Sequence, residues 1–325
     1  MGNCGGKNAT APADDEQGSS GDGDGEQKKV VVCVLDCAES VGSATVRALS
    51  GKCGDTFSIR GGAKEIDKEK VAPLGELPGV TLMTITMTDK ASLGTALKGV
   101  SVAFITLAPS EDRVDVIEGA LEACKDAGVK HVVLASSTSA GLDIVFGKQC
   151  GEIESKVKES GIPCTVVRLP LFVDSYLGFK DGIVNQSKIC CPVDPQKSHC
   201  PVLVDDVGKA TSAILSSFEK HAEKTYNLVG PRHSYGELVD ILGEVLERKI
   251  EYERVPYESS KQSLISAGMD DWQAAGVVEV MQLIDEGAPE ADIAETGDFK
   301  SITGEEPTEL KIWVTSVKSE FQAAE

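Results

Sequence analysis

The turn after the first predicted strand lacks most of the glycines that such a turn needs in order to hold a phosphate group. Residues Val30–Leu35 form an apolar run typical of a buried strand, and Gly42–Leu49 has the pattern of a helix. A dinucleotide-binding connection of this kind carries G-x-x-G-x-x-G or G-x-G-x-x-G, so that the backbone can approach a pyrophosphate. Here only Gly42 remains, and Asp36 and Glu39 occupy the two earlier glycine positions. Two carboxylates are therefore predicted where phosphates would lie.

Asp36 and Glu39 oppose phosphate binding by volume and by charge. A side chain at position 39 takes the space that a closely approaching backbone needs. Two like unit charges about 4 Å apart repel by about 4 kcal/mol at an effective dielectric constant of about 20. Repulsion of that size would remove roughly three decades of affinity for each contact. NADP is therefore predicted to bind weakly or not at all, unless the loop has a different shape and holds a cofactor in another register.

The rest of the chain alternates short apolar runs with helical patterns, which predicts an α/β fold. The runs are rich in β-branched residues and continuously apolar, as strands covered on both faces should be. The predicted strands are Val30–Leu35, Thr56–Arg60, Val80–Thr86, Ser101–Leu107, His131–Ser136 and Cys164–Leu169, with Lys224–Leu228 as one more. Strand–helix alternation of this length predicts a doubly wound parallel sheet, a Rossmann domain, with right-handed crossovers.

Composition divides the chain into three parts. Residues 1–28 form an acidic Gly/Ser-rich tail without apolar periodicity, which is predicted to be disordered. Residues 29–230 form the predicted Rossmann domain. Residues 231–325 form a small, acidic, mainly helical domain over the carboxyl ends of the strands. In this last part Ser234 and Glu237 predict a capping box, and Thr308 is predicted to cap the final helix.

The net charge of −20 lies mainly at the two ends of the chain. Six acids and one lysine fall in residues 1–27, and fourteen acids and three lysines fall in residues 270–325. This balance disfavours nucleic acid as a partner, because phosphate contacts need Lys and Arg. It is compatible with a protein partner that has a basic surface, or with a place in a larger assembly. The alternative is that the charge serves solubility.

The cysteines and the apolar runs indicate in which cellular compartment the protein is located. Ten cysteines include no C-x-x-C pair, which suits a reducing cytosol better than a disulfide framework. The group Cys190, Cys191, His199 and Cys200 matches no common zinc spacing, so no metal site is predicted. There is no run of about 18 apolar residues that could span a membrane, and no secretory h-region is recognisable at the start. The predicted location is cytoplasmic.

The first residues suggest a lipid anchor. Gly2 becomes an acceptor for myristate once Met1 is removed, and Cys4 beside it could take palmitate. Two acyl chains would anchor the protein stably, whereas one alone binds marginally. Position 6 is Gly6 where the myristoylation pattern has Ser or Thr. Membrane association through acylation therefore stays open as a prediction.

Arg60 and Lys64 follow the second predicted strand. An acid at this strand end takes ribose hydroxyls in an ordinary dinucleotide fold, whereas an arginine accepts a 2′-phosphate. The pair would therefore favour NADP over NAD. Two alternatives are a solvated strand end and an ion pair between Arg60 and Asp36 in a vacated phosphate site.

The catalytic residues of a short-chain reductase are incomplete. Ser136 and the two hydroxyl residues after it follow the fifth strand, where such a serine works with a Tyr-x-x-x-Lys helix. The pair Tyr176 and Lys180 has this spacing but lies beyond the sixth strand. In the helix that should carry the pair, Lys148 has Ile144 four residues before it. No proton donor and no catalytic residue are therefore predicted, although Lys148 could hold a ribose if it is not simply solvated.

Several longer passages resemble the NmrA-like group of atypical short-chain dehydrogenase/reductases, which includes NADPH-sensing regulators and quinone oxidoreductases. The passages are Asp89–Leu93 with Ala96–Val100, His131–Ser137, Ser160–Pro170, Tyr226–Pro231 and Ser234–Leu238. The resemblance covers Val30 to Phe321. It implies a Rossmann core, an NADP-type cofactor and a substrate cleft between two domains.

The resemblance also implies roles for single residues. Gly42, Arg60 and Lys148 match cofactor-contacting positions, and Thr106 to Pro109 match the segment beside the nicotinamide. The chain departs from the family at Asp36 and Glu39. It also has Thr86 where the family usually has an Asp near the adenine, and the helix of Lys148 is about two residues longer. These departures favour a non-catalytic regulatory or structural interaction module. The alternatives are an NADPH-dependent quinone-type oxidoreductase and a weakly binding NADPH redox sensor.

Overall fold

The computed structural model describes residue 1 and residues 30–53, 57–288 and 296–322. Gly2 and Cys4, together with the tail predicted to be disordered, lie outside the described residues. No helix in the part of the chain that the model describes is long and apolar enough to cross a membrane.

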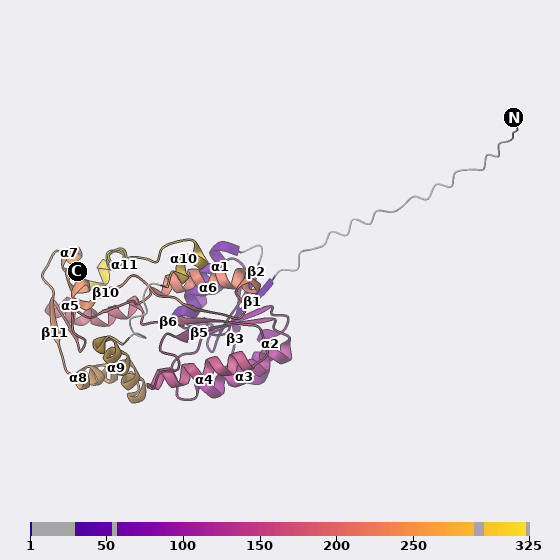
Figure 1. Cartoon of the computed structure of the whole chain (residues 1–325), viewed down its shortest axis with the longest axis horizontal. Coiled ribbons are helices and arrows are strands. Elements are labelled where there is room, and N and C mark those ends of the chain that lie inside the picture. The colour runs from indigo at the N-terminus through magenta and orange to yellow at the C-terminus, as the bar shows by residue number, and fades with distance from the viewer. Residues whose placement is uncertain (2–29, 54–56, 289–295, 323–325) are drawn as a thin grey trace.

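A seven-stranded parallel sheet forms the larger part of the molecule, as predicted (Figure 1). Its strands lie in the order β3-β2-β1-β4-β5-β6-β9, and every neighbouring pair is parallel. In chain order the strands are β1 (Val30–Val34), β2 (Phe57–Ala63), β3 (Val80–Thr84), β4 (Val102–Ile105), β5 (His131–Ser137), β6 (Cys164–Leu169) and β9 (Lys224–Asn227). The strand order reverses between β1 and β4. In an open parallel sheet such a reversal leaves a crevice at the carboxyl ends of the strands.

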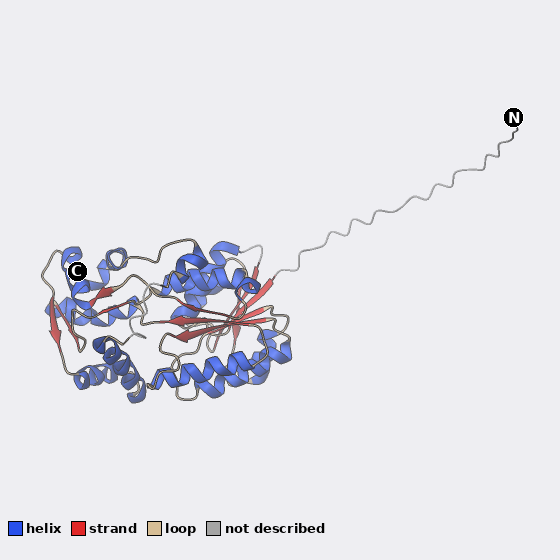
Figure 2. Ribbon diagram, in the orientation of Figure 1, coloured by secondary structure: helices blue, strands red, loops and turns tan. Residues whose placement is uncertain are grey.

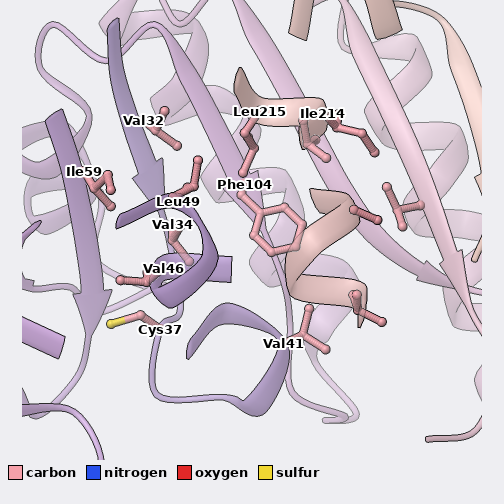
Figure 3. Packing of buried hydrophobic residues seen from close by; sticks show 14 of the residues in the cluster. Val32, Val34, Cys37, Val41, Val46, Leu49, Ile59, Phe104, Ile214 and Leu215 are labelled. Atoms are coloured by element: carbon pink, nitrogen blue, oxygen red, sulfur yellow. The ribbon is translucent and has the colours of Figure 1, made fainter. Parts of the chain in front are cut away.

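Helices cover both faces of this sheet (Figure 1). On one face lie α1 (Ser40–Cys53) and α6 (Val204–Ser216), and on the other lie α2 (Lys90–Leu97), α3 (Arg113–Ala127) and α4 (Val145–Glu159). The first face packs Val46 and Leu49 of α1 and Ile214 of α6 against Val32 and Phe104 of the sheet (Figure 3). Each face of the sheet therefore has its own apolar core, which explains why the strands are apolar at successive positions.

A smaller part lies beyond the carboxyl ends of the strands (Figure 2). Its elements are α5 (Lys180–Gln186), β7 (Lys188–Cys191), β8 (Ser198–His199), β10 (His233–Ser234), α7 (Tyr235–Leu246), β11 (Glu251–Arg254), α8 (Tyr257–Ser266), α9 (Asp271–Glu286) and α11 (Leu310–Ser316). Four short 3-10 segments, Ala72–Glu76, Val173–Phe179, Phe218–His221 and Lys318–Phe321, and helix α10 (Asp298–Thr303) complete the described elements. The core of the smaller part contains Tyr176 and Ile189 as well as Leu238 and Trp313. It therefore draws on residues before position 231.

Two cap predictions have different outcomes. The capping box at α7 is confirmed, because the Ser234 hydroxyl accepts from Glu237 N–H and the Glu237 carboxylate accepts from Ser234 N–H. The prediction that Thr308 caps the final helix is wrong. Its N–H and its hydroxyl both donate to the buried Asp206 carboxylate, at 2.7 and 3.0 Å, and Glu309 is the residue that precedes α11. A buried carboxylate needs donors, and Thr308 supplies two of them.

Helices α1 and α6 approach each other closely at Gly208. A Cβ atom at this position would lie 2.7 Å from the carbonyl carbon and oxygen of Ala44. We expect Gly208→Ala to lower the free energy of unfolding by about 1–3 kcal/mol, because backbone atoms must move to admit the methyl group. Gly94→Ala in α2 is the matched control, since nothing lies within 4 Å of its Cβ position. It should be neutral or stabilising by up to about 1 kcal/mol. Urea unfolding of both variants measures the difference, and equal values would contradict this packing account.

Candidate functional site

A cavity of about 350 Å³ opens at the carboxyl edge of the sheet, against helix α9 of the smaller part. We call it the edge cavity. Three segments that follow strands contribute to its lining, as do the start of α1, the first residue of α3 and one face of α4. The lining residues are Glu39–Val41, Thr106–Pro109, Arg113, Ala135–Ser139, Phe146, Cys150, Leu169–Phe172, Ser175, Gln273, Val277, Val280 and Leu283. The volume is within the range of small-molecule sites.

Three of the predicted site residues meet in this cavity. Thr106 and Pro109 follow β4, and Ser136 lies at the end of β5. Parallel strands end at the same edge of a sheet, so residues that follow neighbouring strands converge. Glu39 also lines the cavity, at the start of α1. Gly42, Arg60 and Lys148 are not among its lining residues.

The carboxylate of Asp36 turns back onto its own loop. Its Oδ1 accepts a hydrogen bond from Ala38 N–H at 3.1 Å. Burial raises the pKa of Asp36, and hydrogen bonds from the N–H groups of Ala38 and Glu39 partly offset that rise. Backbone N–H groups between a strand and a helix are the donors that bind phosphate in dinucleotide folds. In this chain an internal carboxylate takes up those donors.

Gly42 allows the close contact between the first strand and helix α1 that a glycine provides in this turn. A Cβ at position 42 would lie 1.8 Å from the carbonyl oxygen of Asp36, so any side chain would displace the strand from the helix. Glu39 directly precedes α1, its carbonyl accepts from Ser43 N–H at 2.8 Å, and the residue as a whole is exposed. Partial desolvation of its carboxyl group and the neighbouring Asp36 raise the pKa of Glu39. The strand–helix junction is therefore intact, while the part that would hold phosphates carries two acids.

Arg60 does not pair with Asp36, so that alternative is wrong. Strand β2 continues to Ala63, which places Arg60 within the strand and not at its end. Its guanidinium donates to the carbonyl oxygens of Ala96 and Lys98 at 2.6 and 2.8 Å. These carbonyls lie at the carboxyl end of α2, where a cation is favoured by the helix dipole. Arg60 therefore fastens α2 to the sheet.

Lys148 and Tyr176 both lie outside the edge cavity lining. The Lys148 ammonium pairs with the Asp143 carboxylate at 2.6 Å, and both side chains are exposed. Tyr176 is buried in the smaller part, where its hydroxyl contacts Nε2 of His199 and of His233 at 3.0 and 2.9 Å. The face of α4 that lines the cavity carries Phe146 and Cys150.

Ser136 is held by a buried ion pair. Its hydroxyl donates to Glu154 at 2.7 Å, and the Arg168 guanidinium makes two contacts of 2.8 Å with the same carboxylate. Burial opposes ionisation of Glu154, but the hydrogen bonds from Arg168 and Ser136 outweigh it and hold the pKa of Glu154 below its usual value. The serine at the expected position thus has a structural partner and no tyrosine beside it.

Arg113, Phe146 and Cys150 are cavity residues that the sequence analysis missed. Arg113 is the first residue of α3 and is only 7% exposed, although arginine is usually a surface residue. The spacing of Phe146 and Cys150 by four residues would have placed them on one helix face. Among the described residues, no group of three or more His, Cys, Asp or Glu side chains is placed to hold a metal ion.

The model of the NmrA-like family matches residues 27–315. The chain belongs to the NmrA-like family. An NAD(P)H azoreductase of Xenophilus azovorans is 26% identical over 208 residues, which span 63% of this chain and 72% of that protein.

Several solved structures share the fold of this chain. An NADPH-dependent quinone oxidoreductase of Escherichia coli, complexed with NADPH, superposes with a TM-score of 0.78 at 19% identity, over 89% of this chain and 100% of that one. NmrA, a negative transcriptional regulator in complex with NADP, superposes with a TM-score of 0.75 at 16% identity, over 90% of this chain and 96% of that one. One scaffold therefore carries both a quinone oxidoreductase and a transcriptional regulator.

The two raised carboxyl pKa values predict a pH dependence of dinucleotide affinity. Because the pKa values of Asp36 and Glu39 are raised, both groups lose their charge on acidification earlier than ordinary carboxyls do. We expect the affinity for NADP⁺ to rise on acidification from about pH 7.5, and to rise more steeply than the affinity of Asp36→Asn/Glu39→Gln does. In this double variant neither loop side chain titrates, so its pH profile shows the effect of the ligand's own phosphate groups alone. Calorimetry across this range tests the expectation, and parallel profiles for the two proteins would refute it.

Proposed function

We propose that this NmrA-like protein is a non-catalytic regulatory module whose dinucleotide seat is filled by its own carboxylate. The hydrogen bond from Ala38 N–H to Asp36 carries the proposal. A pyrophosphate would have to displace Asp36 from the loop and then lie beside two acids. The phosphate seat of this chain therefore does not fit NADP(H), and the protein binds it weakly or not at all.

The edge cavity supports the absence of catalysis. Among the described residues, its lining includes no tyrosine, histidine or lysine that could give a proton to a reduced substrate. The Ser136 hydroxyl is committed to Glu154, and burial raises the pKa of the Cys150 thiol. The cavity is suited to binding a small molecule, and Glu39 is the carboxyl group that its described lining offers.

The module acts through a protein partner in this proposal. Some of the acidic residues in positions 270–325 lie at the start of α9, and one side of α9 lines the edge cavity. A ligand in the cavity would contact α9, and a basic surface would be attracted to the acidic end of the chain. The regulator NmrA in the same family is consistent with this kind of role.

A reductase is the second candidate. The edge cavity reaches from the start of α1 to α9 and has an apolar wall, so it would admit a flat, hydrophobic acceptor. The azoreductase and the quinone oxidoreductase among the relatives act with NAD(P)H. A third possibility, a weak NADPH sensor, differs from the first only in affinity.

An activity assay separates the module from the reductase. NADPH oxidation is followed in the presence of a benzoquinone and, separately, of an azo dye, at substrate concentrations that saturate typical reductases. We expect no oxidation above the rate without protein. Acceptor-dependent turnover that is lost on heating would establish the reductase and refute the module.

A further inference from the structure

Arg113 is a buried cation that has no anionic partner in the part of the chain that the structure describes. Its side chain lines the edge cavity and is 7% exposed as a residue. Nη2 contacts the carbonyl oxygen of Phe146 at 3.3 Å and Sγ of Cys150 at 3.5 Å, while Nε has no hydrogen-bond partner. The described residues provide no carboxylate that pairs with this guanidinium. Burying a charge is costly unless it is paired, so this arrangement is unusual for a side chain with a purely structural role.

The surroundings hold the guanidinium in place without neutralising it. The ring of Phe146 lies 5.7 Å from the guanidinium carbon, which gives a cation–π contact. Phe146 in turn packs against Gly276 of α9, where a Cβ atom would lie within 2.9 Å of the ring. Arg113 is thus positioned by α4 and α9 at the wall of the cavity.

The remainder of the wall is mostly apolar. Pro109, Leu171, Val277 and Val280 come from three different segments and face the same space. Pockets of this kind bind an apolar body and fix its orientation with a few polar groups. A charged donor in such a wall selects a ligand of opposite charge, because the ligand supplies the missing partner.

We propose that the edge cavity binds a small carboxylic acid with an apolar, ring-sized body, and that Arg113 anchors the carboxylate. The proposal rests on the proposed function, since it names the ligand class of the same module. A dinucleotide phosphate is a poorer match, because Asp36 and Glu39 repel it at the start of α1. A single carboxylate on an otherwise apolar molecule finds its cationic partner in Arg113, whereas a dinucleotide would also place phosphates beside Asp36 and the Glu39 carboxylate that lines the same cavity.

The test compares 2-naphthoate with its neutral analogue 2-naphthamide by calorimetry on the full chain without dinucleotide. We expect the wild type to bind naphthoate about ten- to hundredfold more tightly than naphthamide, as a charge-assisted contact in a buried site should give. Arg113→Gln should bring the ratio of the two affinities close to one. Arg47→Gln, which removes an exposed arginine of α1, should leave the ratio unchanged.

A second variant keeps the test decisive if Arg113→Gln does not fold. Arg113→Lys retains the charge but loses the planar fork, so the ratio should fall severalfold. A wild-type ratio near one, or a wild-type ratio that is unchanged in Arg113→Gln or Arg113→Lys, overturns the proposal. A wild-type ratio near one together with a lower NADP⁺ affinity in Arg113→Gln would show that the guanidinium serves a phosphate. NADPH turnover is measured separately, so a failure of the proposed function is recognised independently.

Discussion

Replacing both acids of the loop should create the phosphate seat that the chain lacks. In Asp36→Gly/Glu39→Gly the N–H groups of residues 38 and 39 are released, and no carboxylate lies beside the entering pyrophosphate. Full repulsion at short range would be about 4 kcal/mol for each contact. Both side chains reach solvent in part, which screens the charges. We therefore expect the NADPH affinity to rise by about a hundredfold, measured by calorimetry or by cofactor fluorescence.

One control variant separates the effect of the carboxylate charges from the effect of a side chain that occupies the loop donors. Asp36→Asn/Glu39→Gln removes both charges but leaves an amide oxygen that can accept from Ala38 N–H. If charge alone excludes the cofactor, this variant will equal the glycine variant. We expect an intermediate affinity, because the amide still occupies the donors. An unchanged affinity in the double glycine variant would mean that the loop acids do not decide cofactor binding.

We expect loss of the Glu154 carboxylate to lower the free energy of unfolding at least as much as Gly208→Ala does. The side chain of Glu154 is 4% exposed and accepts from Ser136 and twice from Arg168. Removing one partner of a buried ion pair leaves the other charge unpaired. The Arg168 side chain is partly exposed, so we expect Glu154→Gln to lower the free energy of unfolding by about 2–3 kcal/mol at neutral pH. Glu159→Gln, at an exposed position of the same helix, should change it by less than about 0.5 kcal/mol.

The stability that Glu154→Gln loses relative to wild type should depend on pH in one direction. The pKa of Glu154 in the folded protein lies below its usual value of 4.5. A depressed carboxyl pKa contributes stability that is fully present above the unfolded pKa and is lost as pH falls through the folded one. The difference between wild type and Glu154→Gln should thus be constant from neutral pH to about pH 5 and shrink below it. A difference that grows on acidification would contradict the ion pair.

The fold could be predicted from the sequence because parallel strands leave a clear pattern. Runs such as His131–Ser137 and Cys164–Leu169 are apolar at successive positions, since helices cover both faces of the sheet. The residues at which the strands end are harder to predict from the sequence. Strand β2 continues past Arg60 through Gly61 and Gly62, which pair with β3, although glycine usually weakens a strand. Because β2 continues to Ala63, Arg60 lies inside the strand and not beside the loop that follows β1.

The candidate site could be predicted only where it follows the sheet. Thr106 and Ser136 come directly after neighbouring strands, so their convergence follows from the topology. Arg113 and Phe146 lie on helices, and their meeting with Gly276 depends on how α3, α4 and α9 pack. No local pattern specifies such a contact between segments that are far apart in sequence. A buried arginine can be recognised only once its surroundings are known.

The carboxylate of Asp36 holds the loop donors that a pyrophosphate would need. Calorimetric titration of the wild-type chain with NADPH at about pH 7.5 measures how far this excludes the cofactor. We expect a dissociation constant weaker than about 100 μM, or no detectable heat. Submicromolar binding would contradict this exclusion, because the cofactor would then displace Asp36 at little cost.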